Sequence, residues 1–387
     1  MTCATAGADR HEDDILYPTT LPFILIHLAA FAALWTGVSG WALGLCVGLY
    51  VLRMFGVTGG YHRYFSHRAY ATGRAFQFVL AFLAQSSGQK SVLWWASKHR
   101  HHHLYSDMPE DVHSPRQKGF LYSHVGWIFA RRHDAAELGN VPDLTRFREL
   151  RWLHRYEQLP LITLGLACFL LGGWQALIVG FVWSTVLVYH ATFCINSLAH
   201  VSGTQRYVTG DDSRNNLILA ILTMGEGWHN NHHAFQRSAR QGFRRREIDI
   251  TFYILKLLSL LGLVRNLKAL PARFVRNEHR LAPKIVHRTA ELLAARFHPR
   301  PIAEALQSHL GRDELSTLHD TLEGAPAPSA PVWRLFHPHI PCRDTLLAEA
   351  RALFARTPSL DEIVDRAHHL VIAGVRKHLV GPASAAA

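Results

Sequence analysis

The sequence contains few cysteines and no secretory leader. Only five cysteines occur in 387 residues, their number is odd, and they are scattered. None of the close spacings of a zinc-thiolate site occurs, so we expect neither a disulfide framework nor a cysteine metal site. The N-terminus has no basic segment that leads into an apolar stretch and a small-residue cleavage site. We therefore expect a reducing compartment and no cleaved signal peptide.

Charge is missing from two long apolar regions. Residues 19–57 carry almost no charge before Arg53, and residues 159–205 contain no Lys, Arg, Asp or Glu. A soluble domain does not separate its apolar residues from its charged residues in this way. The net charge of +12 does not indicate nucleic acid as a partner, because phosphate-binding proteins spread basic residues over a polar fold without apolar runs of bilayer length. The composition indicates a membrane protein.

Four segments approach the roughly 20 apolar residues that cross a bilayer. They are residues 19–37, 39–57, 157–173 and 175–195. Short turns join the first two segments and the last two, so each pair predicts a hairpin of antiparallel helices. The alternative, four buried helices of a soluble bundle, is disfavoured because the segments lack a polar stripe.

The charges outside these segments predict the orientation in the membrane. Residues 58–156 carry 14 Lys or Arg, whereas the two hairpin turns carry none. By the positive-inside rule, residues 1–18, residues 58–156 and everything after residue 196 lie in the cytoplasm. The prediction is an all-α, multi-pass integral membrane protein with a cytoplasmic helical cap. The membrane helices and the cap together form one domain, residues 19–270.

Two further stretches do not predict membrane helices. Residues 76–95 are apolar in part, but Gln85 to Lys90 make them too polar to span, so we expect a helix that dips into the interface or packs beneath the spans. Residues 271–387 change to Ala, Leu, Arg and Glu at helical spacing, with a proline-rich break at residues 325–331. This part predicts a soluble helical extension of unknown role.

Histidines recur at fixed spacings on the predicted cytoplasmic side. The pattern His-x-x-His-His occurs twice, at residues 99–103 and 229–233, and two further histidines frame the segment 62–67. Spacings of three and four place side chains on one face of a helix, and Asn196 and His200 share a face in the same way. Neutral imidazole suits iron, copper, zinc or nickel. Nine imidazoles exceed the needs of one ion and predict two: His62, His67, His99, His102, His103, His200, His229, His232 and His233.

These boxes, their order and their positions relative to the apolar segments resemble the membrane fatty-acid desaturases, of the Δ9 acyl-CoA, bacterial stearoyl-CoA desaturase-like type. The resemblance covers about residues 20–270, and further phrases that match are residues 107–114, 120–127, 196–200 and 225–228. It implies two iron ions held by the nine histidines, with Asn196 reaching a metal through water. His101 is not at a ligand position, so a role behind the ligands or at the surface is expected.

The resemblance also implies the reaction. Removing hydrogen from an unactivated methylene needs an oxidant that side chains do not supply but iron with O₂ does. We expect a cis double bond, at Δ9, in a saturated acyl chain whose carrier is coenzyme A, a lipid or acyl carrier protein. No haem or iron–sulfur motif occurs, so electrons must come from a ferredoxin, rubredoxin or cytochrome b5-like donor. Candidates for the substrate site are Lys98, Trp94, Trp95, Trp127, Thr192 and Phe193; core packing is the alternative for the apolar ones.

Two rival functions remain at this stage. A fatty acyl or alkane hydroxylase would use the same scaffold and the same first step. A metal transporter or sensor would place ionisable residues within the spans, where only His27 and His190 qualify; each is expected to be a hydrogen-bonded histidine in a packed helix.

Several polar residues near the boxes have two interpretations each. Glu226, Asp107 and Asp111 either orient metal-bound imidazoles or cap helices and face solvent. The arginines of residues 237–246 face either lipid headgroups and a donor protein, or water alone. The Ser97-Lys98 pair replaces the Arg-Asp pair with which animal acyl-CoA desaturases grip their carrier, so coenzyme A as carrier is in doubt.

Overall fold

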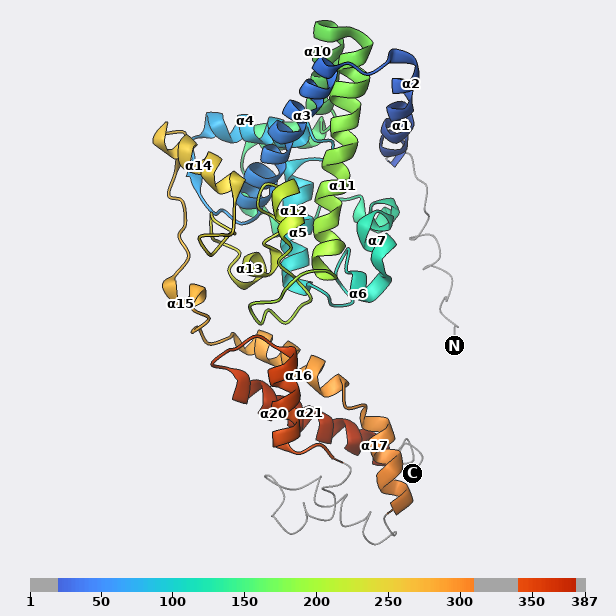
Figure 1. Cartoon of the computed structure of the whole chain (residues 1–387), viewed down its shortest axis with the longest axis vertical. Helices are drawn as coiled ribbons and strands as arrows, with labels where there is room; N and C mark the ends of the chain where they lie inside the picture. Colours follow the sequence, from blue (N-terminus) through green and yellow to red (C-terminus); the bar gives the residue numbers. More distant parts are fainter. Residues whose placement is uncertain (1–19, 310–339, 381–387) are drawn as a thin grey trace, which may run out of the picture. The chain divides into compact units, whose positions relative to one another are not determined.

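The structure is a computed structural model that describes residues 20–309 and 340–380. The predicted cytoplasmic segment 1–18 and the proline-rich stretch 325–331 lie outside these residues. The chain divides into two compact units, the first built from Met1–Thr204 and Asp212–Pro271 and the second from Gln205–Asp211 and Ala272–Ala387. Both units are helical (Figure 1).

The first unit contains the two predicted hairpins and the histidine boxes. Its helices are α1 (Leu21–Ala29), α2 (Ala33–Thr36), α3 (Gly40–Phe55), α4 (Arg74–Gln85), α5 (Val92–Tyr105), α6 (Pro115–Lys118), α7 (Phe120–His124), α8 (Pro142–Thr145), α9 (Arg148–Arg155), α10 (Leu159–Gln175), α11 (Ser184–Asn196), α12 (Leu217–Leu222), α13 (His229–Ala234) and α14 (Ile250–Leu260). Two π-helical segments, η3 (Gly56–Ser66) and η7 (Ala176–Trp183), continue α3 and α10. Short 3₁₀ helices are η2 (Ala30–Ala32), η4 (Gly126–Phe129), η5 (Arg131–His133), η6 (Leu138–Asn140) and η8 (Leu198–His200).

One small sheet departs from the predicted all-α fold. Strands β1 (Ala71–Thr72) and β2 (Val264–Arg265) pair antiparallel, with Ala71 opposite Arg265. This ribbon joins the segment after η3 to the segment after α14, so it fastens both ends of the histidine-bearing region.

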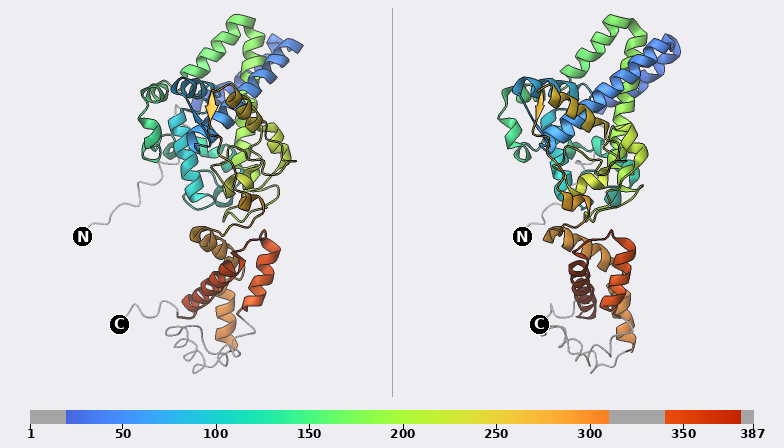
Figure 2. Two further views of the ribbon diagram at one scale, coloured as in Figure 1. Left: turned by 90° about the vertical axis from the view of Figure 1, so that its left-hand side faces the viewer. Right: turned by 60° about the vertical axis from the view of Figure 1, so that its left-hand side comes forward.

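The first hairpin turns where the sequence supplies a glycine and a cap. Gly37 adopts a φ of 71°, which glycine reaches without a steric penalty, and ends α2. The Ser39 hydroxyl then accepts the backbone N–H of Ala42 and begins α3. The second hairpin turns at Gly173, where φ is 62° and ψ −156°. Figure 2 shows both hairpins projecting from the body of the unit.

The helix that begins at Gly40 runs further than predicted. It passes from α3 into η3 without a break and ends at Ser66, so it carries His62 within the same 27-residue helix. Gly56 permits a close approach to α4, because a Cβ at that position would lie 3.0 Å from backbone atoms of Leu83 and Ala84. Gly56 therefore serves the packing of this helix against α4.

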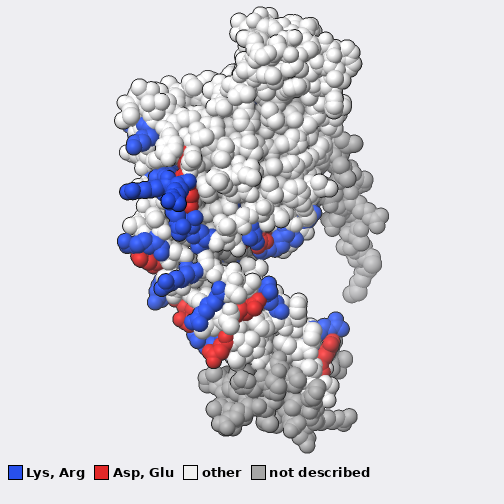
Figure 3. Space-filling model, in the orientation of Figure 1, with Lys and Arg blue, Asp and Glu red and all other residues white. Residues whose placement is uncertain are grey.

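Two helical stretches are long and apolar enough to cross a membrane. They are Gly40–Ser66 and Leu159–His200, and Leu21–Thr36 is a shorter apolar helix. Large apolar side chains on the hairpins face outward: Leu34, Trp35 and Leu171 are each more than four-fifths exposed. On the face shown in Figure 3, the hairpins carry no Lys, Arg, Asp or Glu, which gather on the rest of the chain. The predicted helical fold is confirmed, whereas the four separate membrane spans stay a prediction.

The predicted interface segment is two helices. α4 and α5 are separated at Ser86 to Ser91, and Ser91 begins α5 by accepting the backbone N–H of Trp94. Both helices pack on η3 in the largest hydrophobic core, where Leu80, Ala84 and Leu93 are fully buried. This core holds η3 and α5 in register, and each of them carries histidines.

The second unit is a separate helical bundle. Its helices are α15 (Ala272–Val275), α16 (Pro283–Ala295), α17 (Pro299–His309), α20 (Arg343–Leu353) and α21 (Leu360–Val380). Leu293, Leu346, Ile363, Val371 and Val375 are buried in its core. None of the histidine groups described next includes a residue of this unit.

Candidate metal centre

Five of the nine predicted histidines form one group. His62, His67, His99, His103 and His232 each turn one ring nitrogen toward a common point, with all five atoms within 4.8 Å of one another. Neighbouring Nε2 atoms are 2.8 Å apart for His67 and His99 and 3.0 Å apart for His99 and His103. The Nε2 of His232 lies 3.0 Å from those of both His103 and His62. Three separate elements, η3, α5 and α13, thus meet at this point.

The other four histidines form a second group beside the first. His102, His200, His229 and His233 are all buried and again place one nitrogen each within 4.8 Å of the others. The Nε2 atoms of His200 and His229 are 3.1 Å apart. Helix α5 contributes to both groups, because His102 faces the second and its neighbours His99 and His103 face the first. Helix α13 does the same with His232 and His229.

Carboxylates lie behind these rings, as one interpretation of the sequence predicted. Asp107 accepts from Nδ1 of His200 at 2.9 Å, and both oxygens of Asp111 lie 3.0 Å from Nδ1 of His102. Glu226 contacts Nδ1 of His62. A neutral imidazole has one N–H, and here the carboxylate fixes it on Nδ1. The Nε2 of each of these rings therefore presents a lone pair to the group.

Buried residues hold Glu226 in place. Arg63 follows His62 in η3, is 1% exposed, and donates to Glu226 at 3.0 Å and to Asp249 at 3.0 Å. Burial opposes ionisation of Glu226, but the neighbouring His62 and Arg63 outweigh it and lower the pKa of this carboxyl. Glu226 is therefore ionised at neutral pH and accepts the His62 proton.

Burial keeps the imidazoles neutral. The pKa values of His67, His99, His103, His229 and His232 lie well below the ordinary value, first because burial removes water from the charged form and then because neighbouring imidazoles repel it. Neutral imidazole is the form that binds metal. These five rings are thus ready as ligands without giving up protons.

The spacing of the nitrogens fits metal coordination. Imidazole nitrogen binds such ions at about 2.1 Å, so neighbouring ligands of an octahedral ion lie about 3.0 Å apart; the observed separations are 2.8 to 3.1 Å. The Nδ1 atoms of His62, His102 and His200 face carboxylates, so the Nε2 atoms of these three rings keep lone pairs for an ion. The residues present therefore suit two ions, one in each group.

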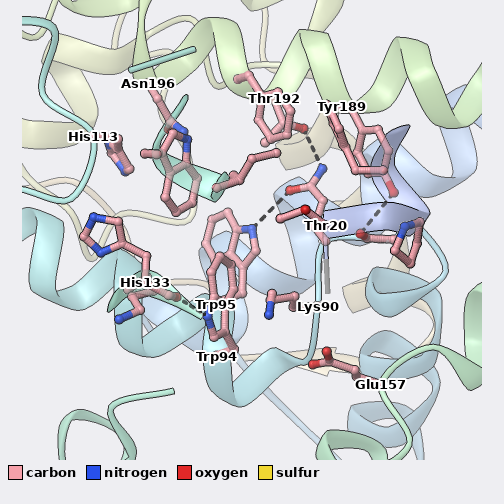
Figure 4. Close-up of a pocket in the computed structure, with 18 of the residues that line it drawn as sticks. Thr20, Lys90, Trp94, Trp95, His113, His133, Glu157, Tyr189, Thr192 and Asn196 are labelled. Carbon is pink, nitrogen blue, oxygen red and sulfur yellow. Dashed lines mark hydrogen bonds between the residues drawn. The ribbon is translucent and has the colours of Figure 1, made fainter. Parts of the chain in front are cut away.

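A cavity of about 350 Å³ opens beside the first group. His99 is part of its wall, and Figure 4 shows Trp94, Trp95, Thr192 and Asn196 around it. A second cavity of about 40 Å³ lies beyond and shares four wall residues with the first: Trp95, His99, Thr192 and Asn196. His99 lines both cavities, and His62, His102 and His229 line the smaller one, so members of both histidine groups face these spaces.

All six predicted substrate residues line the larger cavity. They are Lys98, Trp94, Trp95, Trp127, Thr192 and Phe193. Trp95 donates to Gln89, which in turn donates to Thr192 at 3.0 Å. Lys98 is 4% exposed and pairs with Glu137 at 2.7 Å. Its charge is therefore neutralised within the protein.

The remaining predicted residues lie near the groups but outside them. Asn196 lines both cavities. Asn196 is the last residue of α11, and His200 lies in the 3₁₀ helix η8 that follows it; that the two share a face stays a prediction. His101 points away from both groups and lies 2.9 Å from the carbonyl of Glu110. Arg244, Arg245 and Arg246 are exposed.

Sequence reasoning did not single out His113, which lines the cavity, or Glu137, which pairs with a residue of its wall. His113 is 5% exposed, its ring lies 4.5 Å from that of His102, and its Nδ1 has no hydrogen-bond partner among the described residues. Burial lowers its pKa to about 3. Glu137, the partner of Lys98, carries no motif. The only sequence signal for His113 is its position two residues after Asp111.

Known proteins resemble the chain over the same region. The pattern of the fatty acid desaturase family matches residues 39–246. An sn-1 stearoyl-lipid 9-desaturase of Anabaena variabilis is 36% identical over 271 residues, which are 69% of this chain and 98% of the relative. One of Synechocystis is 37% identical over 284 residues, 72% of this chain and 88% of the relative. The acyl-CoA 5-desaturase AL21 of Anemone leveillei is 37% identical over 247 residues, 63% of this chain and 76% of the relative.

The chain belongs to the fatty acid desaturase family. It is accordingly an oxidoreductase of lipid metabolism, with histidine groups suited to metal and helices suited to a membrane. The resemblance predicted from the sequence is confirmed.

Proposed function

We propose that the protein is a Δ9 acyl desaturase that uses two iron ions, O₂ and two electrons from a separate donor. The observation that carries this proposal is the convergence of nine histidines in two groups, of which His62, His99, His102 and His229 line two adjoining cavities. The most similar relatives given above include two stearoyl-lipid 9-desaturases. The reaction takes two hydrogens from adjacent methylenes and, with two electrons and two protons, reduces O₂ to two waters.

The ligands in this proposal are the nine histidines, with Asn196 acting through water. Iron with O₂ supplies the oxidant that no side chain offers. The protein contributes the rest of the site. Asp107, Asp111 and Glu226 orient the rings. Trp95 and Thr192 line both cavities beside the first group. A saturated chain threaded through both cavities is held so that a bond within its length, away from both ends, lies beside the histidines.

We further propose four membrane spans in two hairpins, with residues 19–270 as the desaturase domain and residues 271–387 as a soluble extension. The turns at Gly37 and Gly173 and the outward apolar side chains support this arrangement. The histidines and the Arg-rich segments would then lie on the cytoplasmic side, where a ferredoxin, rubredoxin or cytochrome b5-like donor reaches them.

We propose a lipid rather than coenzyme A or acyl carrier protein as the carrier of the acyl chain. The cations in the wall of the cavity are paired: Lys98 with Glu137 and Lys90 with Asp134. Glu157 adds a negative charge to the same wall. The several phosphates of coenzyme A would meet no uncompensated cation among these residues, whereas an uncharged headgroup needs none.

Expression in a desaturase-deficient host tests the reaction. We expect cis double bonds at Δ9 in the membrane lipids, determined by mass spectrometry of derivatised methyl esters. A hydroxylated chain as the main product would support the hydroxylase alternative, and metal flux without oxidation would support a transporter. Incubating purified protein with stearoyl-lipid or stearoyl-CoA then tests the carrier, and preference for stearoyl-CoA would contradict the lipid proposal.

A further inference from the structure

Three histidines outside the metal groups form a continuous hydrogen-bonded chain. Nε2 of His27 lies 3.1 Å from Nε2 of His190, and Nδ1 of His190 lies 3.0 Å from Nε2 of His124. The chain ends at the carbonyl of Phe23, 2.7 Å from Nδ1 of His27, and at the hydroxyl of Ser197, 3.0 Å from Nδ1 of His124. These three histidines, which we call the latch, join α1 to α11 and α7.

The latch is satisfied with all three rings neutral. The carbonyl of Phe23 accepts only, so the single N–H of His27 is on Nδ1, and its Nε2 accepts from His190. His190 then accepts from His124, and His124 accepts from Ser197, whose hydroxyl also lies 3.0 Å from the carbonyl of Phe193. The latch therefore stabilises contact between α1 and α11 without needing a charge.

The latch adds side-chain hydrogen bonds to an end of α1 that otherwise packs through Phe23, whose ring contacts Phe129 and Tyr189. No residue of α1 is buried, and Leu25 and Leu28 are both 60% exposed. At the opposite end the segment is fixed at two points: Trp183 donates to the carbonyl of Ala30 at 2.9 Å, and Gln175 donates to the carbonyl of Thr36 at 2.8 Å.

A hinge separates the latched end from the fixed end. The helix changes from α to 3₁₀ geometry in η2 and returns to α in α2. A 3₁₀ segment within a helix often marks a hinge. Because Trp183 holds the hinge itself at Ala30, α1 can rotate about that point while α2 stays with the hairpin.

The N-terminal part of α1 forms one wall of the large cavity. Thr20, Pro22 and Phe23 line it from the α1 side, and Glu157 and Gln158 line it where α10 begins. The ring of Phe23 lies 6.2 Å from that of Phe193, which is on the same wall. A rotation of α1 about its hinge would withdraw Phe23 and open the cavity between two apolar helices.

We propose that α1 is a hinged wall of the cavity, which the latch holds closed and whose movement admits an acyl chain directly from the bilayer. The identity of the admitted molecule rests on the proposed function, whereas the movement itself does not. Lipid-borne substrate fits this route, since its headgroup can stay at the membrane surface while its chain passes between α1 and α10.

Chemical labelling of the cavity tests the movement independently of catalysis. In a full-length chain without its native cysteines, in liposomes, Phe193→Cys places a thiol behind Phe23. Pyrenyl maleimide dissolved in the bilayer is the probe. Removal of one latch bond, in His27→Ala or His190→Ala, should raise the labelling rate by on the order of tenfold, the effect of one hydrogen bond of ordinary net strength on the open fraction.

Two variants provide the controls. Leu25→Ala alters an exposed side chain of the same helix and should leave the rate unchanged, and His27→Gln, which restores a partner for His190, should return it toward the original value. Unchanged labelling in both latch variants would overturn the hinged wall, whether or not the protein desaturates any lipid. A similar increase with Leu25→Ala would also overturn it, because the latch would then have no special part.

A reversible lock tests the consequence for substrate. Cysteines at positions 27 and 190, joined by a reducible bis-methanethiosulfonate, should stop desaturation in the liposomes, and reduction of the linker should restore it. Full activity of the locked protein would contradict access past α1. Loss of all activity in the unmodified protein would count against the proposed function and leave the labelling result to decide on the movement.

Discussion

Two assemblies of histidine in the first unit use the same side chain differently. In the nine-histidine centre, nitrogens from distant elements converge, and carboxylates hold the outer nitrogens of His62, His102 and His200. In the latch, each ring binds the next in a line, and no carboxylate bonds to it among the described residues. Convergence and a carboxylate behind the ring, rather than the number of histidines, therefore distinguish a metal centre from a structural link.

The largest effect should come from removing a ring of the centre. His102→Ala deletes a buried ligand of the second group and leaves Asp111 without its partner. We expect double bonds in the deficient host to fall to background, measured by gas chromatography of lipid methyl esters. Desaturation at a substantial fraction of the original level would show that the second group is dispensable and would remove the basis of the comparison.

The next effect should come from the carboxylates. Asp111→Asn keeps the shape of the side chain but loses the charge that orients His102, and such changes typically cost about 10- to 100-fold in metal affinity or activity. Iron content after equilibration with a chelator measures the loss. The matched control is Asp212→Asn, because Asp212 forms a partly exposed pair with Arg116, and this type of pair contributes little.

Lowering the pH should destabilise the protein through the buried histidines of the centre. The histidines of the first group whose pKa is depressed stay neutral in the folded protein, whereas in the unfolded chain they bind protons below about pH 6.5. The unfolded state then holds more protons, so stability of the metal-free protein falls as the pH drops through that value. We expect lower melting temperatures and loss of iron between about pH 6.5 and 5, followed by calorimetry and metal analysis. A melting temperature independent of pH in this range would contradict neutral, buried rings.

The smallest effect should come from His101, a histidine that belongs to neither assembly. His101 lies next to His102 in sequence, but it binds the carbonyl of Glu110 and lies beside Glu137. His101→Ala should change the free energy of unfolding by no more than about 0.5 kcal/mol, as is usual for surface positions, and leave the iron content unchanged. A loss of iron as large as that in His102→Ala would refute the division of ligands described here.

The sequence predicts the centre better than the latch for a physical reason. Residues three and four apart on one helix are neighbours whatever the fold. The spacing within the boxes of α5 and α13 therefore predicts which histidines lie together. The contacts between His27 and His190, or between Lys98 and Glu137, join distant elements that only tertiary packing brings together. The hairpins were predictable because long uncharged apolar segments indicate helices that suit a bilayer. The extension of α3 into η3 was not predictable, because it depends on how closely Gly56 approaches α4.

The sharing of α5 and α13 between the two groups has a consequence for assembly. Each helix carries ligands for both sites on adjacent turns, so an ion bound in the first group fixes the backbone that presents His102 and His229 to the second. The first ion removes conformational freedom that the second would otherwise have to restrict, and the second should therefore bind more tightly. Titration with ferrous iron should then be cooperative, with singly occupied molecules scarce at every stage of loading.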